Sequence, residues 1–399
     1  MNHSKTLFFF YFLFFLPTLF AQRDLSMESL NKVASNALAT DYQLVWQDNF
    51  DGTQLDETNN WVIEVNGDGG GNAELQYYRR ENISVGPEPV SGAGCLIITG
   101  KKENFSGKFC TSGRLKTSGK MSFKHGKIEA RIKLPHTANG LWPAFWMMGQ
   151  DYPLVGWPKC GEIDILEMGN VNGINRGTQD RYFSSWFHWG ESWNGGAYPN
   201  WGKDFTNPTG IQDDFHLFTL IWDDHSLKTY FDLDKDPLKA PIVEMTIDGN
   251  DVVGNAAHYF HKNFYVIFNL AIGGNFTGIR DINNITALAN GNVYMYVDYV
   301  RVYQKGVIGE AYSGPALVNS IDKVASISYQ IYPNPVEGQI HIEGEEIPTE
   351  VDIYSVTGQF MKKVTNTDFI DVSTLPTGIY LVKISGINGK EEMHRLIKK

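Results

Sequence analysis

Short runs of alternating apolar and polar residues dominate the chain from about residue 42 to residue 303. Clear examples are 127–134 (KIEARIKL), 218–222 (FTLIW) and 294–303 (YMYVDYVRVY). Alternation with a period of two indicates strands that bury one face, and the Gly, Asn, Asp and Pro residues between the runs indicate turns. Many short strands over this length predict an all-β fold in which antiparallel strands form a sandwich.

A second, smaller β pattern begins near residue 328. Its runs are 329–332 (YQIY), 339–342 (QIHI), 351–354 (VDIY) and 378–384 (GIYLVKI), and a basic tail follows at 395–399. Residues 306–327 contain Gly, Ala and Ser and predict a linker between the two patterns. We therefore expect a large domain over 41–305, a small β-sandwich module over 328–399 and a polar lead segment at 22–40.

The first 21 residues have the pattern of a secretory signal. Lys5 precedes an apolar run at 7–20 (LFFFYFLFFLPTLF), and Ala21 supplies a small residue at its end. The run is shorter than the roughly 20 residues that span a bilayer, and Pro17 interrupts it. We expect cleavage of residues 1–21 and export of a protein without a membrane anchor.

Composition narrows the class of partner. The chain has 399 residues, with 40 Gly, 16 Pro and a formal net charge of -11. Nucleic acid and anionic membrane surfaces would repel such a protein, and a strongly sulfated polysaccharide would do so more weakly. Three Cys are too few for a disulfide scaffold. Cys95 and Cys110 are expected either to form one bridge or to remain, with Cys160, as buried thiols.

Three carboxylates lie close together in the segment 161–167 (GEIDILE), which is otherwise apolar. Side chains alternate along a strand, so Glu162 and Asp164 share one face, whereas a regular strand would turn Glu167 away. A single β-bulge would return Glu167 to the face of the other two acids. The two Glu would then be roughly 13 Å apart at Cα. Inward-leaning side chains would bring their carboxyl groups to the roughly 5–5.5 Å that is typical of a retaining glycosidase.

This spacing assigns a role to each acid. Glu162 would attack the anomeric carbon, Glu167 would act as acid and then base, and Asp164 would bias the charges of the two Glu. An exposed acidic face and a calcium site are the alternatives. The apolar neighbours of the acids argue against the first, and the usual placement of calcium ligands in loops argues against the second.

Six blocks of sequence, spread in order from about residue 42 to 304, resemble glycoside hydrolase family 16, and most closely its bacterial laminarinase branch. The blocks are 71–78 (GNAELQYY), 126–131 (GKIEAR), 141–149 (LWPAFWMMG), 156–168 (GWPKCGEIDILEM), 269–276 (NLAIGGNF) and 297–303 (VDYVRVY). The resemblance implies a β-jelly-roll sandwich with an open concave cleft, a bulged acid motif and catalysis without a cofactor. The expected partner is a β-glucan polysaccharide, and the expected protein is a monomer.

Several further residues are candidates for substrate binding. Trp142 and Trp146 are four residues apart in a strand-like run and share a face, which suits stacking on glucose rings, although a core position is the alternative. The resemblance places polar contacts at Asn72, Glu74, His188 and Asn269. Trp189 begins a Gly-rich and Asn-rich stretch, where it would either line an acceptor subsite or cap the edge of the sandwich.

One departure from the family concerns a structural calcium. The family's early motif reads Asp-Glu-Phe, whereas this chain has Asp48, Asn49 and Phe50. The resemblance implies a calcium ligand at Asp298, and the loss of one charged ligand at Asn49 would weaken the affinity of that site.

The C-terminal pattern resembles the secretion-sorting domain of exported Bacteroidetes enzymes. The matching segments are 332–335 (YPNP), 353–358 (IYSVTG), 375–382 (LPTGIYLV) and the basic tail. The resemblance implies that the type IX secretion machinery is a partner and that the protein is secreted or attached to the cell surface. For the large domain, hydrolysis of 1,3-β-glucan is the preferred function. An agarase, porphyranase or carrageenase with the same acid motif and a non-catalytic glucan-binding lectin are the alternatives.

Overall fold

The computed structural model describes residues 42–193, 195–249, 251–316, 329–344, 347–355, 359–386 and 391–399, without the side chains of 391–393. The predicted signal at 1–21 and lead segment at 22–40 lie outside the described residues. The chain divides into two compact units, with the boundary between Leu317 and Val318.

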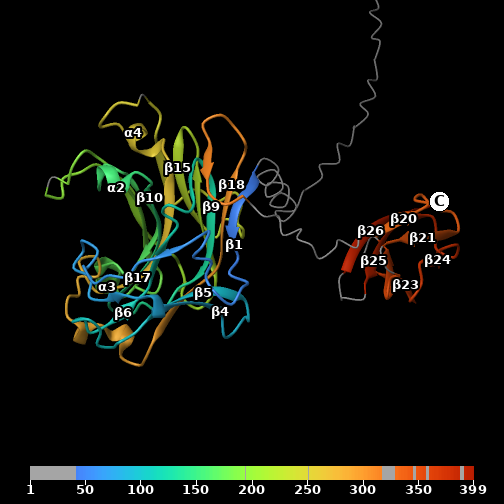
Figure 1. Ribbon diagram of the computed structural model, residues 1–399, viewed down its shortest axis with the longest axis horizontal. Helices are drawn as coiled ribbons and strands as arrows, with labels where there is room; N and C mark the ends of the chain where they lie inside the picture. The colour runs from blue at the N-terminus through green and yellow to red at the C-terminus, as the bar shows by residue number, and fades with distance from the viewer. Residues whose placement is uncertain are drawn as a thin grey trace, which may run out of the picture. The chain divides into compact units, whose positions relative to one another are not determined.

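The first unit is a sandwich of two large, mostly antiparallel sheets (Figure 1). The nine-stranded sheet contains β13 (Asn200–Thr206), β12 (Tyr182–His188), β11 (Glu162–Met168), β10 (Leu141–Gly149), β17 (Phe264–Ile272), β7 (Arg114–Lys116), β2 (Val62–Ile63), β8 (Ser122–Lys124) and β19 (Ala311–Ser313). The eight-stranded sheet contains β16 (Val243–Thr246), β15 (Ser226–Phe231), β14 (His216–Trp222), β9 (Gly126–Lys133), β18 (Val293–Gln304), β5 (Gly94–Gly100), β4 (Ile83–Pro87) and β1 (Gln43–Asp48). The predicted all-β sandwich is confirmed.

Short elements connect these strands. They are the parallel pair β3 (Tyr77–Tyr78) and β6 (Thr111–Ser112), the helices α2 (Tyr152–Val155), α3 (Val171–Arg176) and α4 (Ala256–Phe260), and the 3-10 turns η1 (Arg80–Asn82), η2 (Ile282–Asn284) and η3 (Thr286–Leu288). Two of the helices flank β11, because α2 precedes it and α3 follows it in the chain.

The period-two pattern of β10 separates the core from the outer face of the nine-stranded sheet. Leu141, Phe145 and Met147 point into the core between the sheets, where the ring of Phe145 stacks on Phe268 of β17 at 4.8 Å. Each such buried side chain contributes about 2–3 kcal/mol by leaving water. Trp142 and Trp146 alternate with these residues and point to the opposite, outer face.

The first unit extends further along the chain than the sequence predicts. The composition of residues 306–316 predicts a linker, but β19 pairs with β8 in the register Ala311 to Lys124. The side-chain amide of Gln304 donates to the Ala311 carbonyl at 3.0 Å. Glu310 accepts backbone N–H groups of 305–307. Backbone pairing, which the Gly and Ser content of this segment does not reveal, places it in the sheet.

The second unit has its own core between two small sheets. One sheet contains β20 (Gln330–Tyr332), β21 (Gln339–Glu343) and β24 (Phe369–Asp371), and the other contains β23 (Phe360–Thr365), β22 (Glu350–Ser355), β25 (Gly378–Ser385) and β26 (Glu391–Lys398). Alternate apolar residues of these strands, such as Ile340, Ile353 and Val382, are fully buried. The module is the predicted small β-sandwich.

The cysteines of the first unit remain thiols. Cys95, Cys110 and Cys160 are buried and free, so the predicted alternative of a Cys95–Cys110 bridge is wrong. Burial raises the pKa of each thiol to about 12, which keeps all three protonated and unreactive at neutral pH. Among the described residues, no helix has the length and apolar character needed to cross a membrane.

Candidate active site

A β-bulge interrupts β11 between its second and third acids. Against β10, Phe145 pairs with Leu166 and the next residue, Trp146, pairs with Asp164. Against β12, the register likewise shifts between Asp164 and Glu167. Two consecutive residues of β11, Ile165 and Leu166, therefore occupy the space of one, and both join the core. The structure thus contains the bulge that the spacing of the acids predicted.

The bulge places Glu162, Asp164 and Glu167 on the outer face of the nine-stranded sheet. Ile163, Ile165 and Leu166 point the other way and are fully buried between the sheets. The strand is held in this position because its apolar side chains cannot leave the core without losing several kcal/mol of burial energy. A shift by one residue would move the acids into the core, so packing fixes the site.

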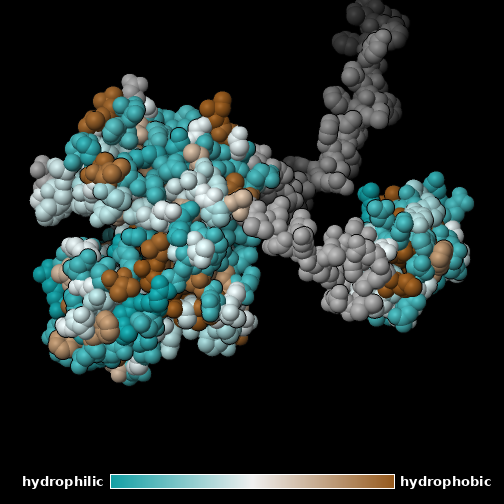
Figure 2. Space-filling model, in the orientation of Figure 1, coloured by the Kyte–Doolittle hydropathy of each residue, from teal (hydrophilic) through white to brown (hydrophobic). Residues whose placement is uncertain are grey.

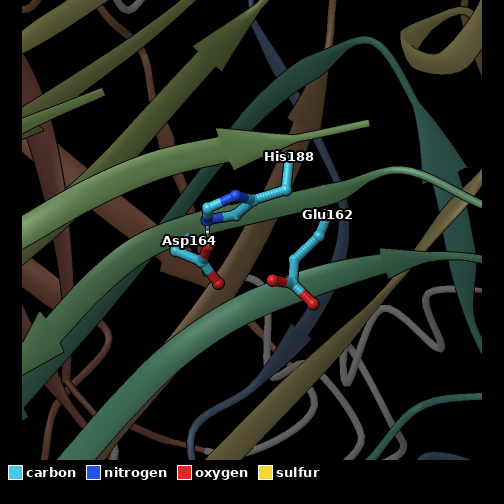
Figure 3. Close-up of side chains that lie close together, drawn as sticks. All are labelled: Glu162, Asp164 and His188. Carbon is cyan, nitrogen blue, oxygen red and sulfur yellow. Dashed lines mark ion pairs between the residues drawn. The ribbon is translucent and has the colours of Figure 1, made fainter. Parts of the chain in front are cut away.

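His188 lies beside the first two acids. Its strand β12 pairs Glu162 with His188 and Asp164 with Trp186, so the three side chains project from the same face. The Nε2 atom of His188 lies 3.3 Å from Oδ2 of Asp164. One potential ligand atom from each of Glu162, Asp164 and His188 lies within 4.8 Å of the others. Figure 3 shows the three side chains gathered together. His188 therefore lies beside two of the acids, and its predicted contact with a sugar stays a prediction.

Trp142 contacts the third acid directly. Its indole Nε1 donates a 3.0 Å hydrogen bond to Oε1 of Glu167. The indole also stacks on Phe276 with ring centroids 4.5 Å apart and an angle of 13° between the rings. Trp142 is 9% exposed. Trp142 therefore orients the carboxyl group of Glu167 and leaves only a small part of its own ring open to a ligand.

Trp146 is fixed next to Asp164 by two neighbours. Its Nε1 donates to Oδ1 of Asn269 on β17 at 2.7 Å. The guanidinium of Arg114 on β7 lies over the same indole, 4.9 Å from the ring centroid. Asn269 is only 5% exposed, so it acts by positioning Trp146. Arg114 was not singled out from the sequence, because no local pattern links a residue of β7 to β10.

Glu74 does not lie where a sugar would reach it. It is 5% exposed, and its Oε2 accepts hydrogen bonds from Gln76 at 2.6 Å and Tyr78 at 2.9 Å. The nearby charge of Arg114 lowers the carboxyl pKa, but burial outweighs it and raises that pKa overall. The predicted sugar contact is therefore corrected to a buried carboxyl group that accepts hydrogen bonds from Gln76 and Tyr78.

Asn72 lies beside the loop that carries Phe276. Its carbonyl accepts the backbone N–H of Asn275 at 2.8 Å, and its side chain is partly exposed. Phe276, whose ring stacks on Trp142, is the residue that follows Asn275. The predicted sugar contact of Asn72 stays a prediction.

Trp189 was predicted to line a subsite or cap the edge of the sandwich, and the structure corrects the first of these. Its ring packs against the core, with its centroid 5.7 Å from that of Phe260. The aromatic neighbour that does share the face of the acids is Trp186, two residues before His188 on β12. Alternation along 182–188 would have revealed it, because residues two apart share a face.

Two loop aromatics complete the surroundings of His188. The centroid of the Trp157 ring lies 6.5 Å from that of His188, and the centroid of Tyr198 lies 5.6 Å from it. Neither was predicted, since both come from loops that only the folded chain brings to β12.

The acids share an environment that keeps protons bound. Burial and then the charge of Asp164 raise the pKa of Glu167 to about 8, while His188 and the Trp142 hydrogen bond act in the opposite direction. Burial raises the pKa of Asp164 well above its usual range. Burial and then the charge of Asp164 raise the pKa of Glu162 well above its usual range. His188 and Arg114 lower this pKa, but their effect is smaller. The cluster therefore carries fewer negative charges than carboxyl groups near neutral pH.

Two sets of residues are relevant to metal binding. Glu162, Asp164 and His188 have the atoms and spacing to hold a metal ion, and among the described residues they form the one such group. The predicted calcium ligand Asp298 does not fit a cation, because Nη1 of Arg131 donates to its Oδ2 at 2.6 Å. Arg301 likewise donates to the side-chain oxygen of Asn49 at 3.0 Å. Guanidinium groups thus occupy both positions that the resemblance assigned to calcium binding.

The surface of the first unit is hollowed between the segment that carries α2 and the segment that carries α3 (Figure 2). The strand β11, with the three acids, lies between α2 and α3 in the chain, and Glu162 is at its α2 end.

Two family models match the chain. Residues 77–237 match glycosyl hydrolases family 16, and residues 330–399 match the secretion system C-terminal sorting domain. The second match confirms the prediction for the C-terminal module and, with it, export to the medium or the cell surface.

Related proteins extend the first match over nearly the whole catalytic unit. The chain is 39% identical to the clotting factor G alpha subunit of Tachypleus tridentatus over 267 residues, which are 66% of this chain and 34% of that protein. A solved family 16 enzyme of Bacteroides ovatus, in complex with a mixed-linkage glucan product, is 39% identical with a TM-score of 0.56, covering 64% of this chain and 99% of that one. The catalytic domain of an endo-1,3-beta-glucanase (laminarinase) from Thermotoga petrophila RKU-1 is 34% identical with a TM-score of 0.54, covering 67% and 99%. The chain therefore belongs to glycosyl hydrolases family 16.

Proposed function

We propose that this protein is an endo-acting hydrolase of 1,3-β-glucan that works by double displacement. The observation that carries the proposal is the bulge in β11, which sets Glu162, Asp164 and Glu167 on one outer face. Two carboxyl groups on one face of a strand are suited to act on the same sugar ring, one as nucleophile and one as acid.

In the first step, a carboxylate oxygen of Glu162 attacks the anomeric carbon and forms a glycosyl ester. The bond from that carbon to the leaving oxygen breaks, and Glu167 donates its proton to the departing oxygen. In the second step, Glu167 accepts a proton from water, the water oxygen bonds to the anomeric carbon and the ester to Glu162 breaks. The sugar leaves with its original anomeric configuration.

The electrostatics support the role of Glu167. A pKa of about 8 keeps Glu167 protonated at neutral pH, as a general acid requires. Burial and the charge of Asp164 also raise the pKa of Glu162, and His188 and Arg114 are the groups that favour its ionisation. Asp164, which is 4% exposed and lies 3.3 Å from His188, raises the pKa of both Glu when it is charged. It therefore couples the charges of the nucleophile and the acid.

The charges around the hollow favour a neutral glucan over a sulfated galactan. Arg114 is the cation above Trp146, and it forms an ion pair with Glu64 at 3.1 Å. The negative charge of Glu74 also stabilises the charged form of Arg114. Lys116 on the same strand is also paired with Glu64, at 2.6 Å. The positive charges of Arg114 and Lys116 are thus already neutralised by Glu64, so they would attract a sulfate group only weakly. Mixed-linkage glucan is the second candidate, because the Bacteroides ovatus relative was solved with a product of that polymer.

The test compares product release from laminarin, mixed-linkage glucan, agarose, porphyran and κ-carrageenan under the same conditions. We expect short oligosaccharides of several lengths from laminarin, with the β anomer formed first in proton NMR spectra. Cleavage of a galactan without action on either glucan would overturn the proposed substrate, and initial release of the α anomer would overturn double displacement.

A further inference from the structure

A fourth carboxyl group lies on the outer face of the nine-stranded sheet, two strands away from Glu167. Ser184 of β12 pairs with Glu167 of β11 on one side and with Asp204 of β13 on the other. Side chains directly opposite each other in a sheet project from the same face, so these three residues form one row across the strands. Neighbouring strands lie about 4.8 Å apart, which puts the backbones of Glu167 and Asp204 roughly 10 Å apart. The charge of Asp204 therefore acts on Glu167 without contact.

Three side chains of β12 donate hydrogen bonds to Asp204. The hydroxyl group of Tyr182 donates to Oδ2 at 2.5 Å, and that of Ser184 donates to Oδ1 at 2.9 Å. The indole Nε1 of Trp186 donates to Oδ1 at 3.3 Å. The donors are two residues apart, so they share the outer face of β12. All three are neutral groups, so they hold the carboxylate in place without cancelling its charge.

The indole of Trp186 is held by Asp204 and by the backbone of β13. Trp186 pairs with Gly202, and a Cβ atom at Gly202 would lie 2.5 Å from Cδ2 of the indole. The ring therefore lies against a position that has room for glycine only. The same ring is nearly parallel to that of His188, with centroids 6.4 Å apart and an angle of 18°. His188 in turn lies 3.3 Å from Asp164, so the orientation of Trp186 is linked to the acids through a single residue.

The charge of Asp204 also acts on the proton of Glu167. Burial and the charge of Asp164 raise the pKa of Glu167 to about 8, and the charge of Asp204 adds to this rise. Burial, and then the hydrogen bond to Asp204, raises the pKa of Tyr182 to about 12, so Tyr182 remains a donor at neutral pH. The other charged or titratable groups that face this row are Glu162 of β11, His188 of β12, Tyr198 of the β12–β13 loop and Arg176 of α3, whose guanidinium lies 5.5 Å from the centroid of the Tyr182 ring. A substitution of Asp204 leaves all of these groups in place, so a changed titration of Glu167 reports Asp204 itself.

We propose that Asp204 is a positioning residue of the active site, which fixes Trp186 beside His188 and acts on Glu167 through its charge. The proposal rests on the hydrolase function proposed above, in which Glu167 gives a proton to the leaving oxygen. The negative charge of Asp204 keeps that proton on Glu167, because it repels a second carboxylate in the same row. The fixed indole restricts the motion of His188, and with it the position of Asp164. Asp204 thus acts through its neighbours rather than on the sugar itself.

Two substitutions in the full mature protein separate the charge of Asp204 from its hydrogen bonds. Asp204→Asn removes the charge and keeps an oxygen that accepts from Ser184 and Trp186, whereas Asp204→Ala removes both. The measurement is the pH dependence of kcat/KM on soluble laminarin, together with kcat at the optimum. Without the charge Glu167 loses its proton more readily, so both variants should move the alkaline limb downward by roughly half to one pH unit, as one charge roughly 10 Å away does. Asp204→Ala should also lower kcat about fivefold, which corresponds to the loss of one orienting hydrogen bond.

Trp186→Phe tests the positioning role by itself, because it keeps a ring over Gly202 and removes only the indole donor. It should lower kcat about fivefold and leave the alkaline limb where it is in the parent protein. Asp213→Asn is the control for charge, since the side chain of Asp213 is 85% exposed, and it should change neither quantity. An unshifted limb in folded Asp204→Asn would overturn the action on Glu167. An unchanged kcat in both Asp204→Ala and Trp186→Phe would overturn the positioning of Trp186.

This proposal and the proposed function fail in different ways. If the protein cleaves another polysaccharide but no glucan, the proposed substrate falls, and the same pH profiles on that polysaccharide decide the role of Asp204. If it cleaves none, carbon-13 NMR of the glutamate carboxyl groups follows the titration of Glu167 directly, and Glu167→Gln identifies its signal. A titration midpoint lowered by roughly half to one pH unit in Asp204→Asn supports the role of the charge, and an equal midpoint overturns it.

Discussion

The indole N–H of Trp142 donates a 3.0 Å hydrogen bond to the carboxyl group of Glu167. This bond favours the charged form of Glu167, whereas burial and Asp164 favour the protonated form. The pKa of about 8 is the balance of these opposing effects. Substitutions that remove one effect at a time should therefore move the alkaline limit of activity in opposite directions.

Trp142→Phe should move the alkaline limb of the pH–rate profile upward. A hydrogen bond worth about 1 kcal/mol corresponds to a shift of roughly 0.7 pH units. The shift is upward because the lost bond had stabilised the carboxylate. The measurement is kcat/KM on soluble laminarin from mildly acidic to strongly alkaline pH. Trp146→Phe is the control, since its indole bonds to Asn269 and not to Glu167; an equal shift in both variants would contradict the assignment.

Asp164→Asn should move the same limb downward. The charge of Asp164 raises the pKa of Glu167, so a neutral amide at this position lowers that pKa. Glu167 is active as an acid while protonated, so activity is present below its pKa and is lost as the pH rises through it. We expect a downward shift on the order of one unit, which lowers the protonated fraction of Glu167, and with it the rate, about twofold at neutral pH. An unshifted limb would show that another group controls it.

Glu162→Gln and Glu167→Gln should each reduce turnover of laminarin by at least about a thousandfold without unfolding the protein. A substrate with an activated aryl leaving group separates the two roles. Such a group departs without a proton, so Glu167→Gln should retain a rapid first release of the aryl alcohol. Glu162→Gln should show no such release. The same behaviour in both variants would exclude Glu162 as the nucleophile and Glu167 as the acid.

A chain that ends after residue 305 should be less stable than one that ends after residue 316. The shorter chain lacks β19 and leaves β8 without its Ala311–Ser313 partner, and it removes Tyr312 from the edge of the core. We expect a loss of about 2 kcal/mol or more in the free energy of unfolding, with a midpoint several degrees lower. Thermal denaturation followed by circular dichroism measures this. Equal unfolding midpoints would show that residues 306–316 do not stabilise the first unit and act as part of the linker.

Chelation of divalent cations should leave the unfolding midpoint unchanged. The guanidinium of Arg131 holds the carboxylate of Asp298, and Arg301 holds the side chain of Asn49. A bound cation would have to displace both or accept strong repulsion. The experiment compares melting curves in EDTA and in millimolar calcium. A midpoint that rises by several degrees with calcium would mean that these arginines leave their partners.

The sequence and the structure contributed to different parts of the site. The acids and their bulge were predictable, because the spacing of Glu162, Asp164 and Glu167 conflicts with a regular strand while their apolar neighbours demand one. Trp146 was predictable in the same way from its place in β10. Arg114 and Tyr198 were not, because each reaches the site from a segment that no local pattern connects to β11. Glu74 was misassigned, and the two alternatives for Trp189 stayed open, because sequence position does not tell a buried partner from an exposed one.

The sequence by itself determined the strand-rich sandwich, the division into a large and a small domain, and the identity of the three acids. Period-two alternation and turn residues are local, and they report directly which face of a strand is buried. Only the tertiary structure decided which charges surround those acids, that β19 belongs to the first sandwich and that arginines hold Asp298 and Asn49. These features arise from contacts between residues far apart in the chain, whose energies depend on burial and distance and leave no periodic trace in the sequence.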